Sequence, residues 1–232
     1  SNCLVHEFII MAAQFKNVVT QIDTTGSGQL LLRCPAGKVI LIKNLIVQNE
    51  NASSSSFFLA FEDNSESTSS FPIQAGTITA GNGVLLEVPL VLEENDELRW
   101  QTSVNAQHIN VHYVQLDNGT KQRYGMVCKS LTTADQSNSF LTCPTGSTMI
   151  VNFVQFFNQS GGTASSNSFS ITDVTGFIKT IDKGSVANNA SAGFNRAFVL
   201  ESGDSLNFTP DEQPFNVYAS FLEIRNPPIR GQ

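Results

Sequence analysis

Positive charge is scarce in this sequence, which has 13 lysine and arginine residues against 20 aspartate and glutamate residues in 232 positions. The formal net charge is −7 at pH 7, and charged residues of both signs make up only 14% of the chain. Proteins that grip a nucleic-acid backbone or an anionic membrane surface need clustered lysine and arginine side chains, and this sequence has no such cluster. We therefore expect neither nucleic acid nor a membrane among the partners.

Cysteine pairs at metal-binding or redox spacing are also missing. The four cysteines are Cys3, Cys34, Cys128 and Cys143, whereas zinc and redox motifs place two cysteines within a few residues of each other. A chain of this length with 41% hydrophobic residues can build cores without disulfide bonds. The sequence therefore predicts buried, reduced thiols. It also has no apolar run that approaches the length of a membrane span.

Histidine, a frequent catalytic base and metal ligand, occurs three times. His108 and His112 lie four residues apart on a predicted strand, so their side chains share a face but are separated by roughly 13 Å at about 3.3 Å per residue. One metal ion cannot bridge that distance, and we expect both residues at the surface. His6 lies outside the repeated part of the chain and has no partner nearby in the sequence.

Other short motifs also favour structure over chemistry. The segment 35–38 lacks the full phosphate-loop pattern, and its counterpart at 144–147 has no lysine, so both are predicted turns. The acidic segments 62–66 and 93–97 lack the alternating oxygen ligands of a calcium loop. We interpret them as solvated loops, with a weak cation site at 62–66 as the alternative. Trp100 is predicted to lie in the core, not on a sugar-binding surface. The sequence thus predicts no enzyme, no cofactor and no metal.

The chain matches itself in two halves. Blocks recur in the same order with an offset that drifts from 109 to 108 and then to 106 residues, which indicates an internal duplication. The matched pairs include Leu32 with Leu141, Cys34 with Cys143, Pro35 with Pro144, Gly37 with Gly146, Asn49 with Asn158, Asp96 with Asp204, Leu98 with Leu206, and Asn110-Val111 with Asn216-Val217.

Each half contains about eight short segments with strand character, separated by turn residues. They include segments near 38–49, 83–92 and 97–102 in the first half and near 147–158 in the second. No sustained helical periodicity is present. We therefore predict an all-β chain with two tandem antiparallel jelly-roll-like β-sandwiches that arose by duplication. Alternation predicts a core that contains Phe57, Leu59, Phe61, Leu98, Trp100, Val111, Phe169, Ile171, Leu206 and Val217.

The two matched halves also suggest the domain boundaries. We expect an N-terminal arm at 1–14, a first sandwich at 15–117 and a linker at 118–124. The linker begins with an Asn-Gly turn signal. A second sandwich is expected at 125–224, followed by a C-terminal arm at 225–232.

The repeated motifs resemble small β-sandwich proteins of tailed bacteriophage particles. In those proteins a Pro-x-Gly-Lys turn leads into a long apolar strand that ends in Asn, as in 34–49 here, and a Gly-Asp-x-Leu turn comes late in the domain. The second half has this turn in full at 203–206, and the first half has Asn95 in place of the glycine. The resemblance spans both halves and implies a virion structural role, such as a capsid decoration (cement) protein or a tail or vertex accessory protein. It implies no catalytic residues.

Three functional hypotheses follow. The first is a structural virion protein that is assembled in the host cytoplasm and binds other capsid or tail subunits. The second is a carbohydrate- or receptor-binding module of a phage tail or fibre that uses loop residues. The third is a hydrolase on a jelly-roll scaffold, for which the sequence offers no candidate residues.

The two ends of the chain are the predicted assembly sites. The N-terminal end carries an apolar run that monomers seldom leave exposed, and the C-terminal end combines prolines with arginines suited to an acidic neighbour. We expect these arms to contact other copies of the chain or a capsid or tail protein, in a homo-oligomer for which a trimer is the expectation. The predicted arm contacts are Phe8, Ile9, Ile10, Arg225, Pro227, Pro228 and Arg230.

Overall fold

A computed structural model of the chain describes residues 13–26, 28–64, 69–87, 89–119, 122–161 and 164–225. The regular structure of these residues consists of β-strands, and all the strand pairs are antiparallel. Within these ranges, no helix has the length and apolar character needed to cross a membrane.

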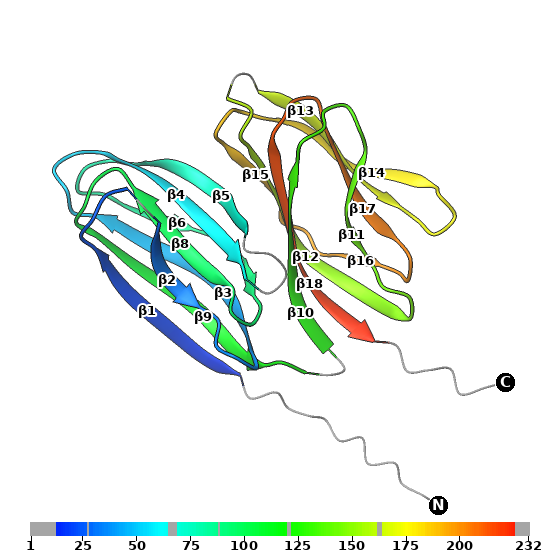
Figure 1. Cartoon of the computed structure of the whole chain (residues 1–232), viewed down its shortest axis with the longest axis horizontal. Coiled ribbons are helices and arrows are strands. Elements are labelled where there is room, and N and C mark those ends of the chain that lie inside the picture. The colour runs from blue at the N-terminus through cyan, green and yellow to red at the C-terminus, as the bar shows by residue number, and fades with distance from the viewer. Residues whose placement is uncertain are drawn as a thin grey trace, which may run out of the picture.

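The first half of the chain forms two facing sheets (Figure 1). One has the strand order β1-β9-β3-β6, with β7 also paired to β3, and the other has the order β2-β8-β4-β5. The strands are β1 (Gln14–Ile22), β2 (Gln29–Arg33), β3 (Lys38–Asn49), β4 (Ser55–Asp63), β5 (Ser69–Ile78), β6 (Gly83–Leu86), β7 (Val91–Leu92), β8 (Glu97–Thr102) and β9 (Gln107–Asp117).

The second half repeats this topology. Its sheets have the orders β10-β18-β12-β15, with β16 also paired to β12, and β11-β17-β13-β14. Both halves are therefore jelly-roll sandwiches, as predicted. The strands are β10 (Gln122–Leu131), β11 (Asn138–Thr142), β12 (Ser147–Asn158), β13 (Ser165–Thr172), β14 (Ile178–Val186), β15 (Ser191–Phe194), β16 (Phe198–Leu200), β17 (Ser205–Pro210) and β18 (Phe215–Arg225).

Irregularities of the ladders confirm the duplication. The register shift between Ile42 and Asn44 in β3 recurs between Val151 and Phe153 in β12, 109 residues later. A bulge inserts an extra residue into a strand, so its recurrence at the same place in both halves indicates common ancestry of the two sandwiches.

The ladder registers also correct one sequence match. Leu45 pairs with Val111 in the first half, and its counterpart Val154 pairs with Ala219 in the second. The offset between β9 and β18 is therefore 108, and the match of Asn110-Val111 to Asn216-Val217 at 106 is wrong by two residues. A slip of two keeps the same side chains on the core face, which is why Val111 and Val217 are both buried nonetheless.

Equivalent turns join the sheets in each half. Asn95 and Gly203 both have positive φ, 70° and 90°, which confirms that Asn replaces Gly in the first copy. The N–H of Asn95 donates to the Cys34 carbonyl at 3.0 Å, and the N–H of Gly203 donates to the Cys143 carbonyl at 3.0 Å. These hydrogen bonds connect the end of β2 to the turn before β8 in the first half. In the second half they connect the end of β11 to the turn before β17.

Each sandwich has its own aromatic core. Trp100 stacks on Phe57 with ring centroids 4.6 Å apart, and its Nε1–H donates to Gln107 Oε1 at 2.7 Å, so the core assignment of this tryptophan is confirmed. Phe156 stacks on Phe208 at 4.2 Å in the second sandwich. The predicted core residues are buried, except Ile171, which is half-buried against the second core.

The two sandwiches meet where β5 crosses the outer face of the sheet β10-β18-β12-β15 (Figure 1). The Ile73 carbonyl accepts hydrogen bonds from Gln155 Nε2 at 2.7 Å and from the Tyr218 hydroxyl at 3.0 Å. Asn216 Nδ2 donates to the Pro72 carbonyl at 3.3 Å. Ile73 and Tyr218 are fully buried, so this contact extends the first core into the second sandwich.

The segment between the sandwiches is shorter than the predicted linker 118–124. Strand β10 begins at Gln122, whose backbone pairs with Ile224. Arg123, expected in the linker, forms an ion pair with Glu93 at 2.8 Å. The prediction failed because strand character at 122–124 comes from pairing with the distant strand β18, which local sequence does not reveal.

Candidate functional site

Arg225 is not part of an arm, and its assignment to one is wrong. It is the last residue of β18 and pairs through its backbone with Ser147 at the start of β12. Its Nε lies 3.8 Å from Glu223 Oε1. The other predicted arm contacts lie outside the described residues: Phe8, Ile9, Ile10, Pro227, Pro228 and Arg230.

The acidic segments are also more ordered than predicted. Glu62 and Asp63 are the last residues of β4 and not part of a loop, and Glu66 lies outside the described residues. Asp96 and Glu97 are buried, so the interpretation of 93–97 as a solvated loop is wrong. The reason is local: Asp96 accepts hydrogen bonds from the backbone N–H groups of Glu93 at 2.9 Å and Asn64 at 3.0 Å, which replace water.

A network of four charged side chains lies on the outer face of the sheet β2-β8-β4-β5. The Glu97 carboxylate accepts from Arg33 Nε at 2.6 Å and from Arg99 Nε at 2.9 Å. Arg99 Nε also lies 2.7 Å from Glu62 Oε2, and Arg99 Nη1 donates to the Gly28 carbonyl at 3.1 Å. Two arginines from neighbouring strands thus enclose one buried carboxylate.

This network sets the protonation state of Glu97. Burial raises the pKa of the carboxyl, but hydrogen bonds from Arg33 and Arg99 outweigh it, so the pKa is lowered from the ordinary 4.5. For Arg99, burial lowers the pKa, and the hydrogen bond to Glu97 and the charge of Glu62 raise it by more. Both groups therefore stay charged at neutral pH. Neither is a general acid or base suited to that range.

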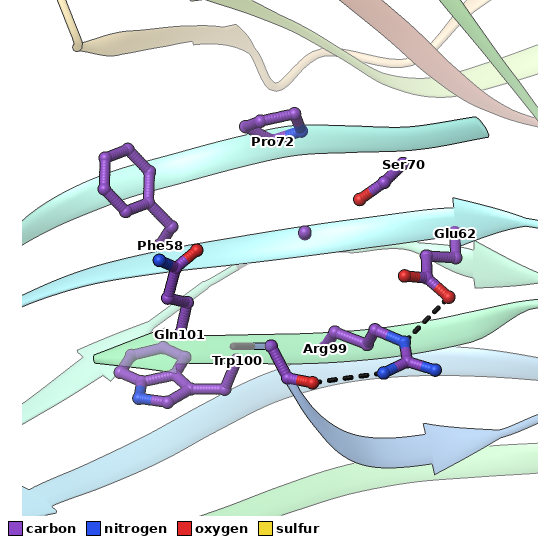
Figure 2. A pocket seen from close by; sticks show the side chains of 9 residues that line it. Phe58, Glu62, Ser70, Pro72, Arg99, Trp100 and Gln101 are labelled. Carbon is purple, nitrogen blue, oxygen red and sulfur yellow. Dashed lines mark hydrogen bonds and ion pairs between the residues drawn. The ribbon is translucent and has the colours of Figure 1, made fainter. Parts of the chain in front are cut away.

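A shallow hollow of about 390 Å³ lies beside this network on the outer face of β4, β5 and β8 (Figure 2). Phe58, which is 38% exposed, and Gln101 line one end, and Glu62 and Arg99 line the other. One dashed line in Figure 2 joins Arg99 to Glu62, and the hydrogen bond to the Gly28 carbonyl holds Arg99 from the other side. An aromatic ring, an amide and a held guanidinium are groups that bind polar ligands.

The second sandwich carries neutral groups at the equivalent positions. Thr142 and Ser205 occupy the positions of Arg33 and Glu97, and Thr142 Oγ1 lies 2.9 Å from Ser205 Oγ. In place of the Arg99–Glu62 ion pair, Asn207 Nδ2 donates to Thr172 Oγ1 at 2.8 Å. The hollow with its charges is therefore a property of the first sandwich alone, among the described residues.

Sequence reasoning missed this site although part of the signal was present. Arg99 and Gln101 alternate with the buried residues Leu98 and Trp100, which places both on the outer face. The partner Glu62 was assigned to a loop. Only the pairing of β4 with β8, where Ala60 lies opposite Arg99, brings these charges together.

The histidines do not form a site with each other. His108 Nε2 lies 3.2 Å from Glu50 Oε2 at the exposed face of β9, whereas His112 is half-buried on the same face. In the part of the chain that the structure describes, no group of three or more His, Cys, Asp or Glu side chains could hold a metal ion.

Three cysteines are free thiols in the structure: Cys34 and Cys143 are buried and Cys128 is half-buried. Cys3 lies outside the described residues. Burial, together with the charge of Asp96, raises the pKa of the Cys34 thiol to about 12, and burial also raises that of Cys143. Such thiols are poor nucleophiles at neutral pH.

No family model and no curated protein sequence matches this chain, but solved structures do. The STIV MCP, from the Sulfolobus Turreted Icosahedral Virus, is 11% identical to this chain. The comparison covers 92% of this chain and 97% of that chain, with a TM-score of 0.38. The major capsid protein P2 from bacteriophage PM2 is 8% identical, with 95% and 100% covered and a TM-score of 0.34. PNGase F, a glycosylasparaginase from Flavobacterium meningosepticum, is 8% identical, with 92% and 96% covered and a TM-score of 0.43.

The last of these comparisons corrects one prediction. The expectation that this chain is not an enzyme is contradicted, because a glycosylasparaginase is among the similar structures over nearly the full length of both chains. At these identities and TM-scores the comparisons identify no activity in this chain.

Proposed function

We propose that this chain is a structural component of a virus particle that binds neighbouring capsid or tail subunits, with a capsid decoration (cement) protein as the favoured form. The observation that carries the proposal is the pair of turn motifs that resemble bacteriophage particle proteins. Both recur in the two sandwiches with the same backbone geometry, with Asn95 in place of Gly in the first and Ser147 in place of Lys in the second. Gly37 and Gly146 have φ of 68° and 79°. The carbonyl of the proline two residues before each glycine accepts a hydrogen bond from the N–H of Lys38 in the first half and of Ser147 in the second.

The contact between the sandwiches supports a role as a building block. Because Ile73 and Tyr218 are fully buried between the two halves, the chain presents one unit to its partners, not two loosely tethered modules. Exposed apolar side chains such as Phe15 and Val19 on β1 and Phe177 beside β14 remain available for contacts with other subunits.

The copy number in purified particles tests this role. A decoration protein is expected in hundreds of copies per particle, and a tail accessory protein in a few. Quantitative mass spectrometry of gradient-purified particles, with a known capsid protein as the internal standard, measures the ratio. Absence of the chain from purified particles would refute the virion role.

The hollow on the first sandwich favours a second candidate, a carbohydrate- or receptor-binding module of a tail or fibre. Phe58 offers an aromatic face beside the amide of Gln101 and the held charge of Arg99. Binding of the purified chain to a glycan array, compared with the Phe58→Ala variant, tests it. Specific binding that the variant loses supports this candidate, and equal binding by both proteins contradicts it.

We also propose that the chain ends make the contacts with the particle and that the homo-oligomer is a trimer. The proposal for the ends rests on their composition: Phe8, Ile9 and Ile10 form an apolar run, and Pro227, Pro228 and Arg230 combine stiffness with positive charge.

A further inference from the structure

The contact within the chain joins two different kinds of surface. One is the free edge of β5, with the carbonyls of Pro72 and Ile73, and the other is the outer face of the sheet β10-β18-β12-β15, which supplies Gln155 and Tyr218. Because the chain is a duplication, it carries each surface twice. The second edge is β14 in the second sandwich, and the second face is the outer face of the sheet β1-β9-β3-β6 in the first.

The second face has no cover among the described residues. By the ladder registers, Ile46 occupies the position of Gln155, and Asn110 occupies that of Tyr218. Ile46 is 46% exposed and lies in one row with the exposed Val19 and Leu85. This row is apolar enough to bury against another surface.

Three neighbouring polar atoms on this face are buried without a hydrogen-bond partner: Asn44 Oδ1, Asn110 Oδ1 and His112 Nε2. Asn44 and His112 lie opposite each other in the β3–β9 ladder, and Asn110 is in the next outward-facing row. Buried polar atoms without partners are costly, and native proteins contain few of them. Of the three residues, Asn110 occupies the position of Tyr218, whose hydroxyl donates to the Ile73 carbonyl in the contact between the sandwiches.

The second edge, strand β14, is likewise not covered by any other described part of the chain. Ile181 lies at the bulge between β13 and β14, as Ile73 lies at the bulge between β4 and β5. Ile73 is fully buried by the second sandwich, whereas Ile181 is half-buried and its neighbour Thr180 is exposed. The turn before β14 adds the exposed side chain of Phe177. An open edge strand offers N–H and C=O groups to any suitable surface.

We propose that the β14 edge of one copy packs on the outer face of the sheet β1-β9-β3-β6 of the next copy, repeating between chains the contact that joins the two sandwiches within a chain. The exposed apolar row of Val19, Ile46 and Leu85 packs against Ile181 and Phe177 at the edge. The contact joins unlike surfaces, so copies associate head to tail. The inference does not depend on the virion role.

Charge substitutions at the two surfaces test the contact. Ile46→Lys and Ile181→Lys each place a charge in the proposed interface, and sedimentation velocity is expected to show oligomers for the wild-type chain and monomers for both variants. Leu30→Lys is the matched control, because Leu30 is 44% exposed but lies on β2, in the sheet β2-β8-β4-β5, which contributes neither surface of the proposed contact. It is expected to leave the oligomer intact. A monomeric wild-type chain, or oligomers that both Lys variants retain, would overturn the proposal.

Disulfide trapping tests the head-to-tail geometry. Cys3 is replaced by Ser, and chains with Ile46→Cys or Ile181→Cys carry tags of different size. A crosslinked species is expected when the two are mixed and not with either chain alone. Crosslinking of the Ile46→Cys chain to itself would show a face-to-face dimer and contradict the proposal. Circular dichroism of every variant checks folding, and because purified protein is used, the result is independent of particle incorporation.

Discussion

At the scale of single residues, Glu97 shows how a buried charge is tolerated in this fold. Its side chain is 1% exposed, while those of Arg33 and Arg99 are 59% and 30% exposed. The two guanidinium groups therefore keep much of their hydration and supply the hydrogen bonds that the carboxylate loses on burial. The network favours one register between β2 and β8, because Arg33 lies opposite Glu97.

Acid titration tests this interpretation. Since folding lowers the pKa of Glu97 below 4.5, its ionised form stabilises the folded chain above that value, and the stabilisation is lost as the pH falls through the lowered pKa. We expect Glu97→Gln to reduce the free energy of unfolding by about 1–3 kcal/mol at neutral pH. Its stability should then fall less steeply than that of the wild type between about pH 5 and pH 2. Parallel pH profiles in urea melts would contradict the role of this carboxylate.

Core packing makes a second prediction at this scale. Phe61 is buried to 1% exposure, so Phe61→Ala removes a ring and leaves a cavity, with an expected cost of about 3–5 kcal/mol. Ser54 is exposed in the loop before β4, and Ser54→Ala should change stability by less than about 0.5 kcal/mol. Thermal melts of both variants provide the comparison. Equal melting temperatures would show that the core assignment is wrong.

At the scale of elements, the turns that contain Asn95 and Gly203 share one backbone conformation but have different residues at the position with positive φ. Gly203 adopts positive φ without steric cost, whereas Asn95 tolerates it through its short polar side chain. Each turn is fixed by an aspartate: Asp96 accepts from the N–H of Glu93 at 2.9 Å, and Asp204 accepts from that of Glu201 at 3.0 Å.

Substitution of Asn95 separates backbone strain from lost contacts. Asn95→Gly should leave stability within about 0.5 kcal/mol of the wild type, and Asn95→Ala should lower it by about 1–2 kcal/mol because alanine is strained at positive φ. Chemical denaturation of the three proteins measures the order. If the alanine variant is as stable as the glycine variant, the left-handed conformation of this turn is not what constrains the residue.

Strand positions were largely predictable, because alternation and turn residues act locally. The segments 38–49, 147–158 and 97–102 were predicted with the bounds that the structure has. The segment 83–92 was predicted as one strand but forms two, β6 and β7, and Pro89 between them lacks the N–H that a ladder needs. The charged network could not be predicted, because it depends on which strands become neighbours.

At the scale of the whole molecule, the contact between sandwiches covers the free edge of β5. Edge strands invite association with other chains, and here the carbonyl of Ile73 is satisfied by two side chains of the second sandwich. The chain thus protects one of its two equivalent edges internally. The β14 edge stays open, which fits a protein that associates with further copies.

Deletion of the chain ends tests the proposed division between folding and assembly. Removal of 1–12 or 226–232 leaves every described strand in place, since β1 begins at Gln14 and β18 ends at Arg225. We expect both truncated chains to be folded and soluble, with melting temperatures near that of the full chain, but no longer incorporated into particles. Normal incorporation of both would refute a role of the ends in assembly.

The proposed virion role requires this two-sandwich chain to be a built-in part of a virus particle. Cryo-electron microscopy of intact particles, compared with particles made without this chain, tests it most directly. We predict difference density at the shell or tail into which the two sandwiches fit as one unit, with β5 against the sheet β10-β18-β12-β15. Particles with identical maps, and the chain recovered only in the unassembled fraction, would contradict it.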